Sequence, residues 1–395
     1  MTHTLFTIFQ YIILFYLSIQ VIYLFFFSVA GKMAKKKSFT PALFYRKIRI
    51  FIPGYKEDSV IIATAISALQ HNYPTHLFEV VIIADSFSVA TLNTLRSLPL
   101  TLVEVNVANR TKGKALQLAI EATLHNPVDI VLVLDADNHM SMGFLYAVNN
   151  AFEQGYEAVQ GHRTAKDPQT AFAFLDACTE EINNHIFRRG HTAVGLPSAL
   201  IGSGMAFSWP LFISLLENIG DTTGEDKELE IRIVRQRIPI AFLNGSYVYD
   251  EKVANAAVFS NQRSRWLATQ VEYFKKYFLE GWSQLLKGNI AFFNKVFQTF
   301  LLPRVMLIAV LLIWVLLAMF LAPAFIKIIS IVLLVLLAAA LLMGIPVNWY
   351  NKRLLNAILQ IPLALFFMLK AMLHIGKAGK QFIHTPHGDN PPLNK

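Results

Sequence analysis

The stretch Val131-Leu132-Val133-Leu134-Asp135-Ala136-Asp137 places two carboxylates one residue apart at the end of an apolar run. Such a run predicts a buried parallel strand, and open α/β sheets bind their ligands beyond the carboxyl ends of their strands. Two hard oxygen ligands at that edge suit Mg²⁺ or Mn²⁺ bound together with a phosphate-bearing substrate. Asp-x-Asp is a weak signal by itself, so its meaning depends on the segments around it.

Apolar, β-branched runs alternate with helix-period segments between Lys47 and about Gly161. This alternation predicts an α/β fold with a doubly wound, mostly parallel sheet covered on both faces. From Asp167 to about Gln270 the chain is expected to be mostly helical, with a Gly-Ser-Gly turn at residues 202–204 and short strands at residues 240–243 and 247–249. The expected strands in the first part are residues 48–52, 80–83, 102–105 and 130–134, and the expected helices are residues 58–69 and 114–124.

The composition predicts a membrane protein with one folded domain between hydrophobic segments. The hydrophobic fraction is 54% and the charged fraction 15%, whereas soluble proteins carry about 25% charged residues. The net charge of +9 arises partly from basic residues beside apolar segments, as at residues 32–37. We therefore expect contact with anionic membrane lipids and no nucleic-acid partner. A single cysteine, Cys178, excludes a disulfide framework and a cysteine-based zinc site.

The hydrophobic pattern divides the chain into six predicted segments. Residues 5–29 carry no charge and are long enough to cross a bilayer, which takes roughly 20 apolar residues. A signal peptide is the competing interpretation, but it needs a basic start and a small-residue cleavage site. The positive-inside rule places the basic linker in the cytoplasm. The predicted segments are a transmembrane helix at 1–30, a basic cytoplasmic linker at 31–46, a cytoplasmic folded domain at 47–270, interfacial amphipathic helices at 271–303, a transmembrane hairpin at 304–346, and an interfacial or re-entrant segment with a basic tail at 347–395.

Several polar motifs follow the expected strands or begin expected helices. Pro53-Gly54-Tyr55-Lys56-Glu57 follows the first strand and Asp85 the second, and both positions can contact a nucleotide, although a plain turn and a helix cap are the simpler readings. Residues 110–116, Arg-Thr-Lys-Gly-Lys-Ala-Leu, begin a helix and suit an anion, without the spacing of a P-loop.

Two further motifs lie in the helical half. Glu225-Asp226 begins a helix, where acids stabilise the helix terminus and where a carboxylate can also act as a general base. Gln262-Arg263-Ser264-Arg265-Trp266 offers an indole face for stacking and a guanidinium for pyrophosphate oxygens. This Gln-x-x-Arg-Trp string is the most specific of the motifs.

In this order the motifs resemble those of the family 2 glycosyltransferases, in the membrane branch that includes cellulose, hyaluronan and poly-N-acetylglucosamine synthases. The resemblance covers Lys47 to Trp266 and makes residues 47–270 the glycosyltransferase domain, of GT-A-like fold. It departs from the family at the first loop, which reads Pro-Gly-Tyr-Lys-Glu where Pro-Ala-Tyr-Asn-Glu is more usual. The chain also has few C-terminal spans from which to build a transmembrane channel for secreting a long polymer.

The resemblance implies a role for each matching residue. Asp226 is implied as the catalytic base, and Asp137, assisted by Asp135, as the ligand of Mg²⁺ or Mn²⁺. The implied donor-binding residues are Pro53, Tyr55, Glu57, Asp85, Lys114 and Asp135. The residues implied for the acceptor and diphosphate are Gln262, Arg265, Trp266 and Gly204.

The resemblance thus implies an inverting, metal-dependent enzyme, a hexosyl- or N-acetylhexosaminyltransferase, at the cytoplasmic face of the cell (inner) membrane. We expect a nucleotide diphosphate sugar, UDP-linked, as donor and a growing polysaccharide as acceptor. Transfer of one sugar to a lipid-linked acceptor is the alternative within the enzyme class. A non-catalytic membrane scaffold that senses nucleotide sugars is the alternative outside it. Membrane lipids and export or accessory membrane proteins are the other expected partners.

Overall fold

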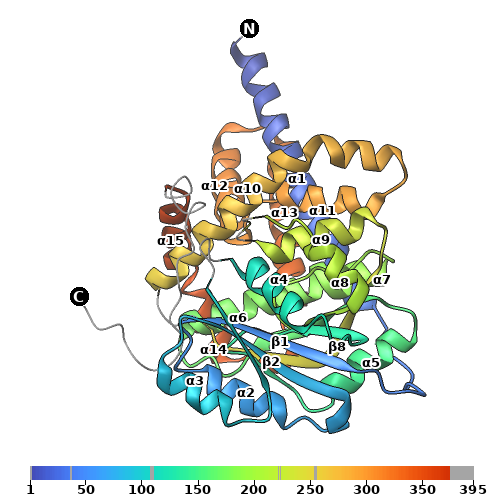
Figure 1. Cartoon of the computed structure of the whole chain (residues 1–395). Coiled ribbons are helices and arrows are strands. Elements are labelled where there is room, and N and C mark those ends of the chain that lie inside the picture. The colour runs from blue at the N-terminus through green and yellow to red at the C-terminus, as the bar shows by residue number, and fades with distance from the viewer. Residues whose placement is uncertain are drawn as a thin grey trace.

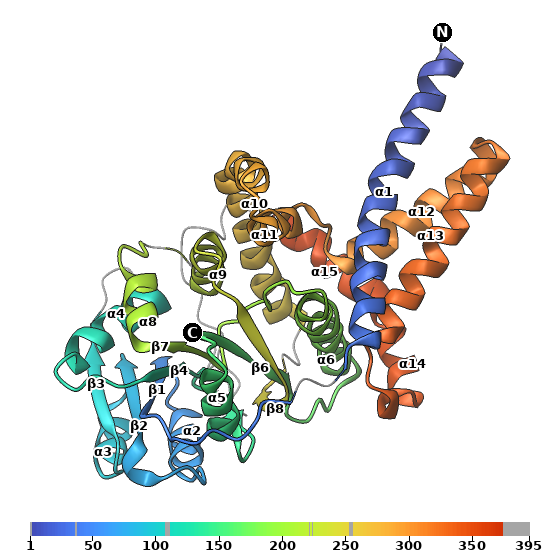
Figure 2. The same ribbon diagram turned by 90° about the vertical axis from the view of Figure 1, so that its right-hand side faces the viewer.

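The computed structural model describes residues 2–35, 38–106, 111–220, 222, 224–252 and 256–373, as an α/β domain with a set of long apolar helices beside it (Figure 1). Figure 2, turned by 90° from Figure 1, shows three of these helices projecting together from the domain. They are α1 (Thr2–Met33), α12 (Arg304–Leu321) and α13 (Ala324–Met343). The basic tail beyond residue 373 and Lys36 and Lys37 of the predicted linker lie outside the described residues.

A mixed eight-stranded sheet forms the centre of the α/β domain. Its first four strands in spatial order are parallel to one another. The antiparallel strand β7 then joins β4 to β6, β8 runs parallel to β6, and the short β5 is antiparallel to β8. This largely parallel sheet agrees with the predicted α/β fold. The strands in spatial order are β3 (Thr101–Val105), β2 (Phe78–Asp85), β1 (Ile48–Tyr55), β4 (Ile130–Val133), β7 (Met205–Ser208), β6 (Ala158–Ala165), β8 (Ile240–Asp250) and β5 (His139–Met140).

The two faces of the sheet bury separate apolar cores because successive side chains of a strand point to opposite faces. In β4, Ile130 and Leu132 pack into one core, whereas Val131 and Val133 pack into the other. The helices on the first face are α2 (Ile61–Leu69), α3 (Val89–Arg96) and α5 (Phe144–Glu153). Those on the second are α4 (Lys112–Thr123), α8 (Trp209–Leu216) and α9 (Glu225–Arg235). A strand buried on both faces reads as a continuous apolar run, which is why residues 131–134 predicted it.

A long helical rod connects the sheet to the apolar helices. It consists of α6 (Ala171–Asn183), a π-helical turn η2 (Asn184–Gly190) and α7 (His191–Ala193). The rod touches the backbone of α1 at η2, because a methyl group on Gly190 would lie 2.2 Å from the carbonyl oxygen of Phe27. Nε2 of His185 lies 2.8 Å from the carbonyl oxygen of Ser28. The absence of a side chain at Gly190 is therefore what allows α1 to pack directly on η2.

Among the described residues, four stretches are long and apolar enough to cross a membrane, namely Leu5–Met33, Arg304–Leu321, Ala324–Met343 and Lys352–Lys370. The first three correspond to α1, α12 and α13, which share one apolar cluster. The fourth, part of the predicted interfacial segment, is divided into α14 (Lys352–Ile358) and α15 (Ile361–Leu373). The preceding short helix η3 (Val347–Trp349) and α14 return the chain to α6, where Arg353 donates to the carbonyl of Pro168 over 2.7 Å.

Two further helices, α10 (Ala256–Leu286) and α11 (Ile290–Phe300), lie between the α/β domain and α12 in the chain. One face of α10 packs on α9, where Tyr273 and Tyr277 are buried. The other face exposes Leu279 and Leu286 by 80% and 89%. This two-sided pattern is what an interfacial helix requires. Since α10 runs unbroken past residue 270, it joins the predicted folded domain to the predicted interfacial segment.

Candidate active site

The loop after β4 carries Asp135 and Asp137 and rests on the loop that precedes β7. The backbone N–H of Asp135 donates to Oγ of the fully buried Ser203 over 3.0 Å. The next residue, Gly204, donates its N–H to the carbonyl of Val133 over 2.8 Å. Gly204 has a φ of +64°, and a methyl group there would lie 2.6 Å from Val248. The predicted Gly-Ser-Gly turn is thus the support that holds the two acids at the sheet edge.

A first polar cluster, the Lys112 cluster, consists of Lys112, Asp135 and Glu225. The ammonium of Lys112 pairs with Asp135, donates to the carbonyl of Gly202 over 2.6 Å, and lies 3.6 Å from Oε1 of Glu225. Lys112 is the first residue of α4, whose N-cap Thr111 accepts from the backbone N–H at position 114. The cluster therefore joins the starts of α4 and α9 to the loop after β4.

The electrostatics of the Lys112 cluster perturb Glu225 most. Burial raises the pKa of the Glu225 carboxyl to about 7; nearby Asp226 and Asp135 add to this rise, and Lys112 opposes it. Sequence reasoning selected Lys114 for the donor, but Lys112 is the lysine that reaches Asp135. The signal was present as Lys-Gly-Lys, but this local pattern does not specify which lysine reaches the loop after β4.

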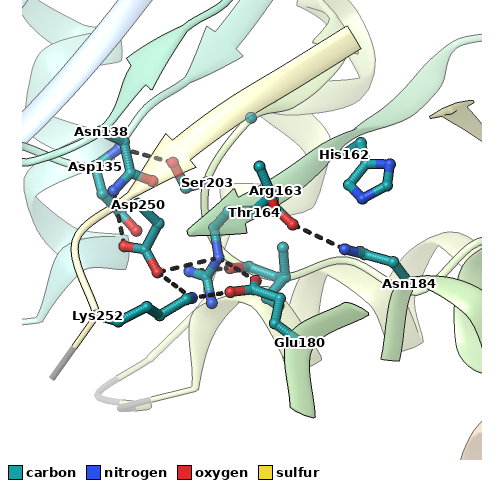
Figure 3. A network of polar contacts seen from close by, with 12 residues as sticks. Asp135, Asn138, His162, Arg163, Thr164, Glu180, Asn184, Ser203, Asp250 and Lys252 are labelled. Atoms are coloured by element: carbon teal, nitrogen blue, oxygen red, sulfur yellow. Dashed lines mark hydrogen bonds and ion pairs between the residues drawn. The ribbon is translucent and has the colours of Figure 1, made fainter. Parts of the chain in front are cut away.

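A second polar cluster, the Lys252 cluster, consists of Arg163, Glu180, Asp250 and Lys252 (Figure 3). The ammonium of Lys252 pairs with Glu180 and lies 2.6 Å from Oδ2 of Asp250. Arg163 lies 2.6 Å from Glu180 and 3.8 Å from Asp250. The cluster joins β6, α6 and the end of β8. None of its members was selected from the sequence, because the expected strand at 247–249 stopped one residue before Asp250.

Asn138 connects the Lys252 cluster to the Asp-x-Asp loop. Its side-chain amide donates to Oδ1 of Asp137 and to Oδ1 of Asp250, both over 3.0 Å. Burial raises the pKa of Asp250 to about 7; the positive charge of Arg163 opposes the rise, and the negative charge of Asp137 adds to it. Asp250 is therefore part of the same electrostatic system as the predicted metal ligand.

The residues predicted to bind the donor nucleotide lie at the same edge of the sheet. Tyr55 and Asp85 are direct neighbours at the ends of β1 and β2, and Asp85 accepts a hydrogen bond from Ser86 over 2.8 Å. Glu57 is buried in the following loop. Pro53 precedes them in β1, and the intervening Gly54 would place a methyl group 3.6 Å from Cβ of Ala136. The end of β1 thus lies against the Asp-x-Asp loop.

The predicted base and the Gln-x-x-Arg-Trp motif lie on two helices. Asp226 is partly buried at the start of α9, where its Oδ1 accepts from the N–H of Lys227 over 2.8 Å. Gln262 and Arg265 are in α10, but their side chains lie outside the described residues. Trp266 follows on α10 with 42% of its surface exposed. The structure therefore places Asp226 beside the Lys112 cluster and leaves the roles of the α10 residues as predictions.

The acids at the sheet edge fit a divalent cation that takes only one or two of its ligands from the protein. Within the described residues no group of three or more His, Cys, Asp or Glu side chains is arranged to hold a metal ion. Mg²⁺ usually needs just one or two carboxylates because substrate phosphates and water supply its other ligands. Asp135 already pairs with Lys112, whereas Asp137 receives a hydrogen bond from the neutral amide of Asn138. Asp137 as the direct ligand, with Asp135 assisting, therefore stays a prediction.

Comparison with known proteins places this site in a family. Residues 46–269 match the family model described as "Glycosyltransferase like family 2". A beta-monoglucosyldiacylglycerol synthase from Trichormus variabilis is 25% identical over 250 residues, which are 62% of this chain and 52% of the relative. The chain therefore spans about half the length of this curated relative.

A solved structure shares the fold. It is the mannosyltransferase PcManGT from Pyrobaculum calidifontis in complex with GDP-Man and Mn²⁺, with a TM-score of 0.52 and 18% identity over 86% of this chain and 99% of that one. This likeness supports the predicted α/β glycosyltransferase fold. The family model spans more than half of the 395 residues. The resemblance inferred from the motifs is therefore confirmed, and the chain belongs to the glycosyltransferase-like family 2.

Proposed function

We propose that this family 2 glycosyltransferase transfers one sugar from a nucleotide diphosphate sugar, UDP-linked, to the hydroxyl of a lipid-linked acceptor at the cytoplasmic face of a membrane. The observation that carries the proposal is the meeting of the Asp-x-Asp loop with the starts of α4 and α9 through the Lys112 cluster, at the sheet edge where β1 and β2 also end. That arrangement sets donor-binding groups and a carboxylate for the acceptor side by side.

The donor nucleotide is proposed to lie between the loops after β1 and β2. Tyr55 supplies a ring for the base, and Glu57 and Asp85 supply acceptors for its N–H groups and for ribose hydroxyls. Lys114, on the first turn of α4, is proposed to face the same ligand, because the N-terminus of a helix favours an anion. Gly204, which has no side chain, lets the loop before β7 lie close to Val248, beneath the proposed position of the diphosphate.

The proposed chemical step is a single displacement. Asp226 accepts the proton of the acceptor hydroxyl while that oxygen attacks the anomeric carbon and the bond to the nucleotide diphosphate breaks. Attack from the face opposite the leaving group inverts the configuration. Gln262, Arg265 and Trp266 are proposed to border the diphosphate and acceptor from α10. A Mg²⁺ or Mn²⁺ ion held by Asp137, with Asp135 nearby, would supply Lewis-acid stabilisation of the leaving diphosphate.

A lipid-linked acceptor is supported by two observations. The matching relative is named for a product built on diacylglycerol. In this chain α13 packs against both α1 and α12, and Leu17, Leu311 and Leu337 of these helices are almost fully buried in one apolar cluster. A packed bundle anchors a domain at a bilayer. A growing polysaccharide is the second candidate, because the Gln-x-x-Arg-Trp string resembles that of processive synthases.

Replacement of the base tests the proposal. Asp226→Asn is expected to lower transfer by at least about 100-fold, with binding of the nucleotide sugar changed less than about threefold. Glu217→Gln, a change in an exposed acid before α9, is the control and is expected to have wild-type transfer. Normal transfer by Asp226→Asn would remove Asp226 from the chemistry. A single lipid-soluble product supports the lipid acceptor, and a ladder of longer products supports the polysaccharide.

A further inference from the structure

A groove of about 800 Å³ lies between the last third of α1 and the edge of the α/β domain. One wall is apolar, and Ile22, Phe26 and Met33 expose 56%, 54% and 78% of their surfaces. The opposite wall is formed by residues 192–197 and 239–242. A large exposed apolar patch requires a covering partner. Here that patch belongs to a helix that contains the candidate span Leu5–Met33, so lipid is the immediate apolar neighbour.

The same groove contains two cationic side chains, Arg189 and Lys35. Arg189 donates from Nη2 to the carbonyl of Ala34 over 3.0 Å. Its Nε is buried and lacks a hydrogen-bond partner among the described residues. No Asp or Glu is among the described residues that line the groove, so the charge of these cations is not balanced there. A guanidinium with an unpaired N–H and an ammonium that line the same groove suit a phosphate group.

The groove is separate from the candidate active site. It is lined by Ile240, Ala241 and Phe242 at the start of β8, whereas Asp250 lies at the other end of that strand. A strand rises about 3.3 Å per residue, so roughly 25 Å of backbone separates Phe242 from Asp250. The groove instead coincides with Met33, where the candidate span ends and lipid head groups are expected.

We infer that this groove binds one anionic glycerophospholipid. Its phosphate contacts Arg189 and Lys35, and an acyl chain covers Ile22 and Phe26 along α1. The inference rests on the membrane placement of α1 proposed above, but it does not depend on which acceptor the enzyme uses. Because α1 packs on η2 at Gly190, a lipid in this groove contacts the anchor and the domain at once.

The test is lipid retention by the full-length protein, purified in mild detergent and measured by native mass spectrometry. Phosphatidylglycerol, phosphatidylcholine and inorganic phosphate are offered separately. The wild-type protein is expected to retain one phosphatidylglycerol, with a preference of about tenfold over phosphatidylcholine. Arg189→Gln is expected to abolish this preference. Lys287→Gln, at an exposed lysine that does not line the groove, is the matched control and is expected to keep it.

A second variant separates the groove from the charge. Ala193→Trp fills the groove from α7 while both cations remain, and it is expected to lower retention of phosphatidylglycerol about tenfold. Thermal unfolding of each variant shows that it is folded. Equal retention by wild type and Arg189→Gln, preference for phosphatidylcholine, or a second protein copy in place of lipid would overturn the inference. Since the readout is binding, loss of the proposed transferase activity would leave this outcome unaffected.

Discussion

The two polar clusters beside the Asp-x-Asp loop differ in their access to solvent. In the Lys112 cluster, the side chains of Lys112 and Asp135 are 18% and 31% exposed. In the Lys252 cluster, Lys252 and Glu180 are each 5% exposed. The first is open where the donor is proposed to bind, whereas the second is closed by β6, α6 and β8. Both contain lysine–carboxylate pairs, so their composition does not distinguish them.

This difference in solvent access indicates that the two clusters have different roles, although their side chains are similar. An open pair can exchange partners when a charged substrate arrives, because its charges remain partly hydrated. A closed pair keeps its partners, since separating buried charges costs about 3–5 kcal/mol. We therefore propose that the Lys112 cluster binds the donor and that the Lys252 cluster positions, through Asn138, the loop that carries Asp137.

The largest effect is expected from a substitution that breaks the open Lys112 cluster. Lys112→Met leaves the Asp135 and Glu225 carboxylates without their shared cation. Transfer is expected to fall by roughly 1,000-fold, since the donor diphosphate then meets unneutralised acids, and an unpaired, partly buried charge costs about 1–3 kcal/mol of stability. Turnover of labelled donor and thermal unfolding measure the two effects. Lys287→Met, at an exposed lysine outside the Lys112 cluster, is the control, and an equal loss there would contradict the choice of Lys112.

A smaller effect on transfer is expected from the closed cluster. Lys252→Met leaves Arg163 to neutralise Glu180, so stability is expected to fall by about 2–3 kcal/mol and transfer by roughly tenfold. The metal-ion concentration needed for half-maximal transfer is expected to rise, because Asp250 would then disturb Asn138 and Asp137. Unchanged metal dependence would show that the closed cluster acts on stability alone.

The smallest expected effect concerns pH. The pKa of Glu225 is raised from its ordinary value of 4.5 to about 7 in the folded protein. Between these values the folded state binds a proton that the unfolded chain does not, so this group's contribution to stability falls as pH rises through the window. Glu225→Gln is expected to reduce the stability difference between pH 5 and pH 8 by at least about 1 kcal/mol. Thermal unfolding at both values, with Glu217→Gln as control, measures it.

Prediction from sequence succeeded where a residue's position follows from strand order. Asp85 ends β2 and Asp135 follows β4, and parallel strands bring their carboxyl ends to one edge, so the placement of both acids at that edge was predictable. Prediction failed for Lys252 and Glu180, which are 72 residues apart in the chain. Neither belongs to a recognisable motif, and their pairing depends on how α6 packs beside β8.

The sequence by itself determined the α/β sheet, the apolar helices at both ends and the family, because these follow from periodicity, hydrophobic length and ordered motifs. The tertiary structure alone decided which lysine meets Asp135, that Asp250 belongs to the site, and that α1 and Arg189 enclose a groove. The physical reason is the separation in sequence between the residues that interact. Local pattern specifies an element and its buried face, but the environment of a charge depends on side chains from distant segments, which come together only when the helices and the sheet have packed.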